Sequence, residues 1–166
     1  MNDTDPRFLR VETDAFVGVR TSVERFLVVS LSGYFPVLTT TGPDTLAVVF
    51  RTGAPHIGAP GTLSISTSDD SGRTWSDSHR IAPRFDDARN PAFGVTSTGR
   101  LIVAYWTAAR HAYRADENGL QWERKPLEEI DEIPALAVRW SDDGGTTWTP
   151  PRFQRTRHFI SGSPFG

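Results

Sequence analysis

Cysteine is absent from this chain of 166 residues, which excludes disulfides and thiol chemistry. Neither sign of charge dominates, because 18 basic residues face 20 acidic ones, and this balance favours neither nucleic acid nor a membrane surface as a partner. No apolar run approaches the ~20 residues of a membrane-spanning helix. The polar start at residues 1–10 does not resemble a signal peptide. We expect a soluble protein that is either cytoplasmic or exported and then processed.

Signatures of metal, phosphate and serine chemistry are missing as well. The four histidines are too scattered to form a recognisable metal-ligand motif; they are His56, His79, His111 and His158. The sequence contains neither a glycine-rich phosphate loop nor the Gly-x-Ser-x-Gly turn that presents a nucleophilic serine. We therefore expect no metal and no cofactor.

The chain does contain many short runs of β-branched and aromatic residues, separated by clusters of Gly, Pro, Asp and Ser. This pattern is typical of strands and turns. It predicts a first pair of strands at 15–19 and 25–30. Two four-strand units follow, the first at 35–40, 46–51, 63–67 and 74–81, and the second at 92–96, 101–107, 135–140 and 147–154.

These strands divide the chain into four parts. Residues 1–32 contain the N-terminal strands, which could complete a terminal unit. Residues 33–82 form the first full unit and residues 83–154 the second, which includes a charged insertion at 109–133. Residues 155–166 begin a further unit.

An eight-residue pattern, Ser-x-Asp-x-Gly-x-Thr-Trp, occurs twice, at 68–75 and at 141–148. Ser and Asp side chains can bond backbone N–H groups inside a tight turn, and Gly accepts the positive φ that such a turn demands. Thr and Trp then begin the outgoing strand. Two copies with similar flanks predict a repeated β unit of the kind found in propellers or in repeat arrays. We assign this structural role to Ser68, Asp70, Gly72, Trp75, Ser141, Asp143, Gly145 and Trp148.

This pattern is the one called the Asp-box, and the chain resembles the sialidase (neuraminidase) family of β-propellers from about residue 33 to residue 166. Segments 33–38, 45–51 and 87–91 resemble the family's opening strands and its entry into the second blade. The resemblance implies an all-β propeller of four-stranded antiparallel blades, six in the parent protein and about two in this chain. Because two blades cannot close a ring, we expect part of a longer protein or a chain that self-associates.

Connections in an antiparallel four-strand unit alternate between the two ends of the sheet. The Asp-boxes therefore lie at one end, and the long connections lie together at the other. Function favours variable loops held by a rigid scaffold, so we place the binding site among the long connections, which are 51–61, 83–91, 109–133 and 155–164.

A guanidinium fork matches a carboxylate, so Arg51 and Arg89 are our candidates for binding an acidic sugar such as sialic acid. The resemblance implies the same role, since Arg51 corresponds to the Arg that closes the family's second strand and Arg89 to the Arg before Asn-Pro. The alternative is that each arginine simply pairs with a nearby Asp. Arg155 and Arg157 are weaker candidates for the same role.

The chain departs from the family at two positions. Phe35 lies near the place of an Arg in the family's carboxylate-binding triad, and His56 lies nearest to its general acid, an Asp. His56 can transfer a proton near neutral pH, and Asp87 can act as a base or contact a sugar hydroxyl, so we predict catalytic roles for both. The alternatives are a plain loop residue or an anion ligand for His56, and a capped turn or an ion pair for Asp87. Only one of Asp87 and its neighbour Asp86 can point to the axis.

Two tryptophans are candidates for contact with a sugar. Trp106, at a strand end close to this face, is predicted to stack on a sugar ring, with packing between blades as the alternative. Trp122 in the insertion is a candidate for sugar or partner contact. The family's nucleophile is a Tyr of a later blade, and neither Tyr105 nor Tyr113 corresponds to it. We therefore expect no sialidase turnover from residues 1–166 alone.

Three hypotheses of function are compatible with these residues. The first is a sialidase-like glycoside hydrolase that removes a terminal acidic sugar from glycoconjugates. The second is a propeller that acts on other glycans, as a lyase or another exo-glycosidase, which suits the departures at Phe35 and His56. The third is a non-catalytic module that binds carbohydrate or protein, with the insertion as its recognition loop.

Overall fold

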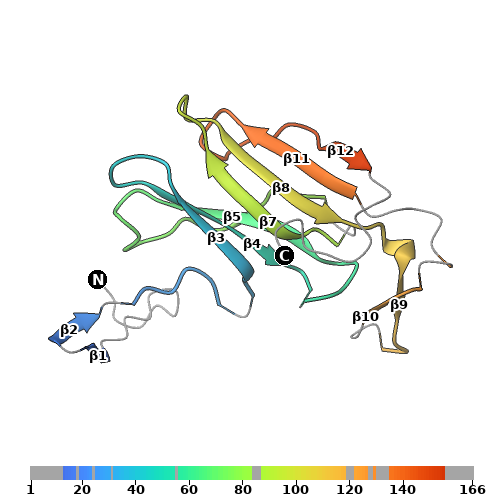
Figure 1. Ribbon diagram of the computed structural model, residues 1–166, viewed down its shortest axis with the longest axis horizontal. Coiled ribbons are helices and arrows are strands. Elements are labelled where there is room, and N and C mark those ends of the chain that lie inside the picture. The colour runs from blue at the N-terminus through green and yellow to red at the C-terminus, as the bar shows by residue number, and fades with distance from the viewer. Residues whose placement is uncertain are drawn as a thin grey trace.

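The computed structural model describes residues 13–17, 19–23, 25–30, 32–54, 56–83, 87–118, 122–126, 129 and 135–155. Two antiparallel four-stranded sheets form most of it (Figure 1). The first sheet contains, in spatial order, β3 (Tyr34–Thr40), β4 (Leu46–Thr52), β5 (Thr62–Ser68) and β6 (His79–Arg80). The second contains β7 (Arg89–Val95), β8 (Leu101–Thr107), β11 (Ala135–Ser141) and β12 (Arg152–Arg155). Both sheets follow the strand order that the sequence predicts.

Two small hairpins lie outside the sheets. The first pairs β1 (Thr13–Val17) with β2 (Val19–Val23). The second belongs to the insertion, where a 3-10 turn, η1 (Arg110–Ala112), leads into β9 (Tyr113–Ala115), which pairs with β10 (Trp122–Arg124). β9 and β10 lie beyond the end of the second sheet at which β8 finishes (Figure 1). Within the described ranges, no helix is long and apolar enough to span a membrane.

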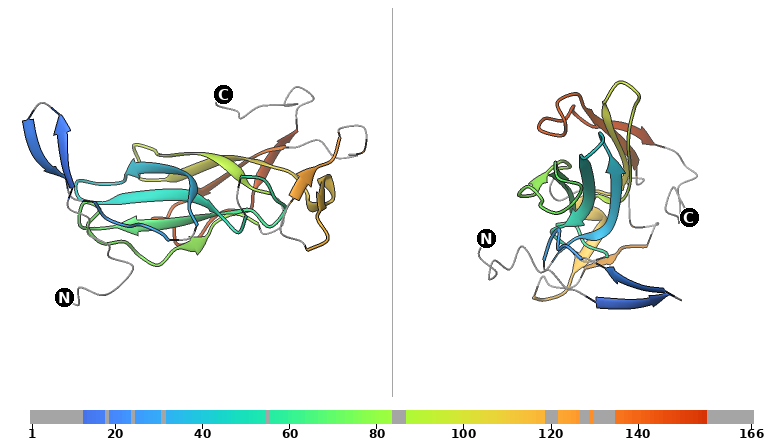
Figure 2. Two further views of the ribbon diagram at one scale, coloured as in Figure 1. Left: turned by 90° about the horizontal axis from the view of Figure 1, so that it is seen from below. Right: turned by 90° about the vertical axis from the view of Figure 1, so that its left-hand side faces the viewer.

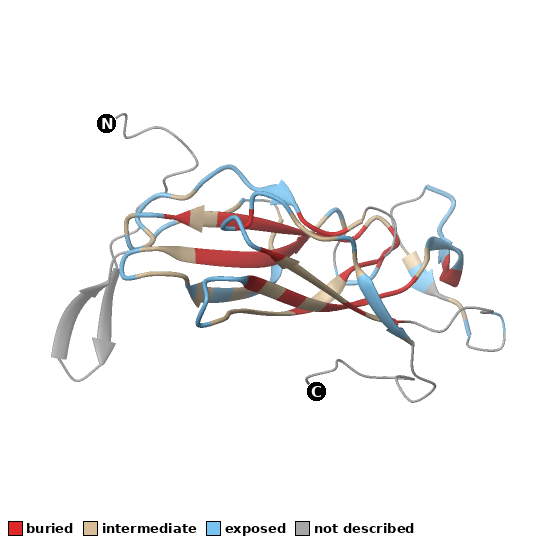
Figure 3. Ribbon diagram, turned by 90° about the horizontal axis from the view of Figure 1, so that it is seen from above, coloured by how far each residue is buried: buried red, intermediate tan, exposed pale blue. Residues whose placement is uncertain are grey.

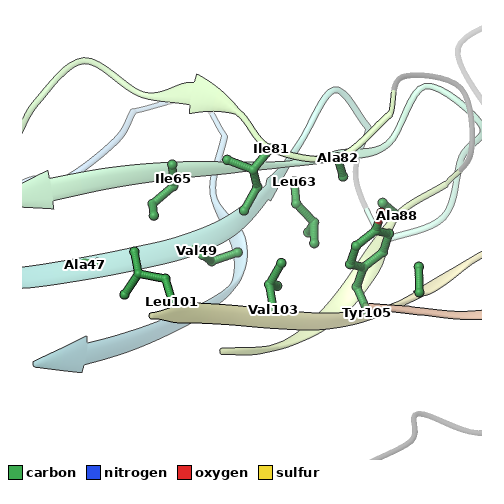
Figure 4. Close-up of a cluster of buried hydrophobic side chains, with 11 residues drawn as sticks. Ala47, Val49, Leu63, Ile65, Ile81, Ala82, Ala88, Leu101, Val103 and Tyr105 are labelled. Carbon is green, nitrogen blue, oxygen red and sulfur yellow. The ribbon is translucent and has the colours of Figure 1, made fainter. Parts of the chain in front are cut away.

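The core lies between the two sheets, which stack face to face (Figure 2). Alternate residues of β4 and β5 point into it, and so do Leu101, Val103 and Tyr105 of β8 (Figure 4). This alternation is what a strand with one face buried requires. Burial is highest along the middle of the strands, and the connecting turns are mostly exposed (Figure 3). The sheets therefore form one rigid base for the loops at their ends.

The two octapeptide turns, 68–75 and 141–148, are built by the same set of hydrogen bonds. In the first, Ser68 Oγ accepts from Gly72 N at 2.8 Å, and Asp70 Oδ1 accepts from Thr74 N at 2.8 Å. In the second, the bonds from Gly145 N to Ser141 Oγ and from Thr147 N to Asp143 Oδ1 are also both 2.8 Å. The indole N–H groups of Trp75 and Trp148 donate to the carbonyls of Gly72 and Gly145, whose φ angles are 87° and 98°.

The strand that follows each octapeptide turn is shorter than the sequence predicts. Instead of the expected strands at 74–81 and 147–154, the structure has only the short strands β6 and β12. The reason is that side-chain hydroxyls replace part of the backbone ladder. Ser76 Oγ accepts from Thr67 N at 3.0 Å, and Thr149 Oγ1 accepts from Trp140 N at 3.1 Å. Both residues directly follow the Trp of their turn.

The prediction of a strand at 25–30 is wrong. β1 pairs with Val19–Val23 instead, and residues 25–30 form no ladder. The apolar stretch 27–29 that prompted the prediction borders a hollow together with residues 75–78. The stretch therefore lies near residues 75–78 without strand pairing.

Candidate functional site

The strand ends away from the octapeptide turns bring the predicted site residues together. Leu46 pairs with Ser68 at one end of the β4–β5 ladder, and Thr52 pairs with Thr62 at the other. Arg51 lies at this second end, and Arg89 begins β7 there. The octapeptide turn at 68–75 contacts the β3–β4 turn at the first end, where Ser71 Oγ donates to Asp44 Oδ1 at 3.0 Å. The alternation of connections predicted this separation of the two ends.

Arg51 is fully buried. Its Nη2 lies 2.7 Å from Asp87 Oδ1 and also donates to the Gly58 carbonyl at 3.1 Å, while Nη1 donates to the Ala88 carbonyl at 2.7 Å. Burial lowers the pKa of Arg51, and the charge of Asp87 opposes this. The guanidinium covers Gly61 so closely that a Cβ at this position would overlap it. Arg51 therefore ties the loop at 58–61 to the segment at 87–88.

Asp87 is the residue on which the other charged groups converge. Its Oδ1 pairs with Arg51, and its Oδ2 lies 3.2 Å from Nε of Arg89 and accepts a hydrogen bond from the Tyr113 hydroxyl. The side chain has no exposed surface, and burial raises its pKa, against the opposing effect of Arg89, Tyr113 and Arg51. Its φ of 38° is uncommon for a residue with a side chain. Backbone of this kind is found at sites where the surroundings hold it in place.

Arg89 is the one arginine of this cluster that reaches solvent, with 11% of its side chain exposed. Its guanidinium carbon lies 4.1 Å from the centre of the Trp106 ring, an arrangement that favours a cation. Nη2 donates to Tyr113 Oη at 3.3 Å and Nη1 to the His56 carbonyl at 3.5 Å. The position of Arg89 is thus set by four side chains or backbone groups.

An open depression of about 420 Å³ lies between the first strands of the two sheets. Its lining is Phe35, Pro36 and Val37 of β3, His56 of the β4–β5 loop, and Asn90, Pro91 and Ala92 of β7. The Phe35 and His56 rings meet edge to face, with centroids 5.3 Å apart. Because the His56 carbonyl contacts Arg89, the arginine lies directly beside this depression.

The two strands that line the depression carry the same irregularity. Phe35 and Asn90 both have positive φ, at 51° and 50°, and each directly precedes a proline. The strand register shifts between Tyr34 and Val37 and again between Arg89 and Ala92. Such bulges bend a strand and re-aim its side chains, and they are common next to functional sites. The repeat therefore extends to the site itself.

The insertion forms a second wall of the site. Tyr113, Ala112 and Ala108 pack with Ala59 and Trp106 in a small apolar cluster, against which Trp122 also packs. The Trp122 ring lies over Gly58 so closely that a Cβ there would approach it to 3.2 Å. The insertion thus holds the loop that carries His56. Sequence analysis missed Tyr113, because a hydroxyl 26 residues from its carboxylate partner has no local signal.

Comparison with known proteins identifies the architecture. No protein-family model and no curated protein matches the chain. Among solved structures, it is similar to a protein of unknown function from Dyadobacter fermentans DSM 18053, with 18% identity over 73% of this chain and 36% of that one, and a TM-score of 0.49. It is also similar to an α-L-arabinanase from Penicillium chrysogenum complexed with arabinobiose, with 16% identity over 81% of this chain and 38% of that one, and a TM-score of 0.50. The chain spans less than two fifths of either structure.

The fold is a β-propeller. The two four-stranded sheets are blades, as the sequence predicted, and the β4–β5 loop, the link between blades and the insertion share one end of them. At this end lie His56, Arg51, Asp87, Arg89 and Trp106. Among the described residues, no group of three or more His, Asp or Glu could hold a metal ion.

The positions of the candidate residues suit some of the predicted roles better than others. All of these roles stay predictions. A ligand carboxylate could reach Arg51 only by displacing Asp87. Trp106 is buried, with Arg89 against its ring, so the packing alternative describes its position. Asp87 forms the ion pairs that were its alternative role, whereas His56 is exposed at the depression. Asp86 and Arg157 lie outside the described residues.

Proposed function

We propose that this chain forms part of the substrate-binding end of a sialidase-like glycoside hydrolase, and that its ligand is the terminal acidic sugar of a glycoconjugate. The proposal rests on one observation above the others: Arg89 is fixed in place by Asp87, Tyr113 and Trp106 and still reaches solvent beside an open depression. A preorganised guanidinium binds a carboxylate with little loss of side-chain entropy.

Each residue of the site has a role in this proposal. Arg89 binds the carboxylate of the sugar, while Asp87, itself paired with Arg51, holds the Arg89 guanidinium in position. Phe35 and the two prolines of the depression contact the apolar face of the sugar ring, as apolar side chains do in small-molecule sites. His56, which is exposed and lines the depression, is the residue to which this proposal assigns proton transfer. The two octapeptide turns are Asp-boxes in this proposal and stabilise the far end of the blades.

A second candidate function is a propeller that binds or processes other glycans. The observation that favours it is the burial of Arg51, which leaves Arg89 as the one guanidinium of this cluster with exposed surface among the described residues. A single arginine suits a uronic acid as well as a sialic acid. The solved arabinanase in complex with arabinobiose shows that a related fold can bind a neutral sugar.

The test is a titration of the purified chain, followed by NMR, with N-acetylneuraminic acid, glucuronic acid and the neutral N-acetylmannosamine. Arg89→Gln is the test variant. Arg100→Gln is its matched control, because Arg100 also pairs with an aspartate (Nε to Asp142 Oδ1, 2.6 Å) and lies near a tryptophan, at the other end of the second blade.

We expect N-acetylneuraminic acid to bind, Arg89→Gln to weaken its binding at least tenfold, and Arg100→Gln to leave it unchanged. Preference for glucuronic acid would favour the second candidate. Equal binding of the acidic and neutral sugars, or an unchanged affinity in Arg89→Gln, would contradict the role of Arg89. A fluorogenic sialoside should not be hydrolysed by this chain alone.

A further inference from the structure

The Tyr113 hydroxyl contacts both members of the ion pair between Asp87 and Arg89. Its hydroxyl donates to Asp87 Oδ2 and accepts from Arg89 Nη2 at 3.3 Å. Asp87 Oδ2 also forms an ion pair with Nε of Arg89, at 3.2 Å. One carboxylate oxygen, one hydroxyl and two nitrogens of the same guanidinium therefore form a closed set of contacts. The set fixes the plane of the guanidinium against the Trp106 ring, whose centre is 4.1 Å away.

The insertion holds Tyr113 firmly. Its side chain is buried, with 5% exposed, among Ala59, Trp106 and Ala112. β9 pairs with β10, and Lys125 N donates to the Ala112 carbonyl at 3.0 Å, which closes the hairpin next to the tyrosine. A hydroxyl on so well packed a ring has a defined position, so it can orient its partners.

Arg89 is less well held by its own strand. It precedes the bulge at Asn90, where the ladder between β7 and β8 is interrupted. A long side chain at such a place keeps many rotamers unless other groups fix it. Asp87 holds Nε through a single oxygen, the Trp106 ring covers one face of the guanidinium, and the bond to the His56 carbonyl is long, at 3.5 Å. These three contacts leave the guanidinium some freedom to rotate about Asp87 Oδ2, and the bond from Nη2 to Tyr113 removes it.

We propose that Tyr113 is a positioning residue for Arg89, and that the charged insertion is therefore part of the ligand-binding site. The Tyr113 hydroxyl is then one route by which the insertion contributes to binding of the acidic sugar proposed above. Tyr113 acts on the ligand through Arg89 and is not itself in contact with it.

The first test needs no ligand. The Nε–Hε group of Arg89 should give an NMR signal displaced by the ring current of Trp106 and protected from exchange by Asp87. Tyr113→Phe should move this signal toward the position of a solvated arginine and speed its exchange at least tenfold. Tyr105→Phe removes another buried hydroxyl, on the core side of β8, and is the matched control. An Arg89 signal that is the same in Tyr113→Phe as in the wild-type chain would overturn the proposal.

A second measurement applies if Tyr113→Phe does not fold. In the wild-type chain, the Arg89 Hε proton should show a nuclear Overhauser effect to the ring protons of Tyr113. Absence of this effect, with the signals of both residues assigned, would overturn the proposal in the same way.

The titration with N-acetylneuraminic acid separates this proposal from the proposed function. Tyr113→Phe should weaken binding roughly tenfold, and the same change should have no effect in the Arg89→Gln background, because Tyr113 acts only through Arg89. An equal loss in both backgrounds would overturn the positioning role while the proposed function stands. No binding to the wild-type chain, with a displaced Arg89 signal in Tyr113→Phe, would overturn the proposed function while the positioning role stands.

Discussion

Arg51 and Asp87 form an ion pair of 2.7 Å, and neither side chain has any exposed surface. The two residues come from consecutive blades, since Arg51 lies one residue before the end of β4, the second strand of one blade, and Asp87 lies two residues before β7, the first strand of the next. Ala88 N also donates to the Gly61 carbonyl at 3.2 Å, which reinforces the same junction. The pair thus joins the blades at the end where Arg89 and the depression lie.

Asp87→Asn should strongly destabilise the chain. The substitution keeps the size of the side chain and removes its charge, so the buried guanidinium of Arg51 loses its ionic partner. Breaking a buried pair in this way costs about 3–5 kcal/mol of unfolding free energy. Urea unfolding measures the loss. Asp142→Asn is the control, because it removes the exposed pair with Arg100 and should change the unfolding free energy far less. Equal losses of unfolding free energy in the two variants would contradict the conclusion that the buried pair of Arg51 and Asp87 stabilises the fold.

Gly61→Ala should destabilise the chain through overpacking. A methyl group on Gly61 overlaps the guanidinium of Arg51, which must then leave its pair with Asp87 or push the loop outward. We expect the substitution to lower the unfolding free energy by roughly 1–3 kcal/mol. Gly94→Ala is the matched control, because a Cβ there meets no atom within 4 Å. If thermal unfolding ranks Gly94→Ala as the more harmful change, Arg51 does not lie over Gly61.

Stability should decrease as the pH falls from about 4 to about 2. Hydrogen bonds from the Thr74 and Thr147 side chains and backbone lower the pKa of Asp70 and of Asp143 from 3.8 to about 2. The folded chain therefore binds fewer protons than the unfolded chain in this window, so the stabilisation is complete above pH 4 and is lost on acidification. Denaturant unfolding across this pH range should show a shallower decrease in the double variant Asp70→Asn, Asp143→Asn. An identical pH slope in wild type and variant would show that neither carboxylate is stabilised by its turn.

Trp122→Ala should loosen the loop that carries His56. The Trp122 ring packs over Gly58, so its removal leaves one side of the loop at 56–61 uncovered. Hydrogen exchange of the amides in this loop should become faster, while exchange in β4 and β8 should stay unchanged. Trp140→Ala, on β11, is the control and should leave the loop as it is. Unaltered exchange at 56–61 in Trp122→Ala would mean that the insertion does not support the loop.

The sequence predicted the strands more completely than the site. The repeat made the strands predictable, because the octapeptide turns at 68–75 and 141–148 occupy equivalent positions in the two blades. The strands before each turn could therefore be aligned with one another. The error at 25–30 arose because an apolar run of three residues looks the same whether it pairs as a strand or only packs.

The candidate residues lie at the end of the blades that the sequence predicted for them, but their contacts were not predictable. An arginine at a strand end is usually exposed, and only the absent Cβ of Gly61 makes room for a buried Arg51. The role of Tyr113 depends on where an insertion of irregular sequence folds back, and no periodicity encodes that. Both facts concern packing between segments distant in the chain.

The most direct test is a crystal structure of the chain with N-acetylneuraminic acid. The account predicts that the carboxylate of the sugar lies in hydrogen-bond contact with the guanidinium of Arg89, that the sugar ring lies over the depression at Phe35 and His56, and that Arg51 stays paired with Asp87. A sugar bound at the end of the blades that carries Trp75 and Trp148, or a carboxylate directed away from Arg89, would contradict it.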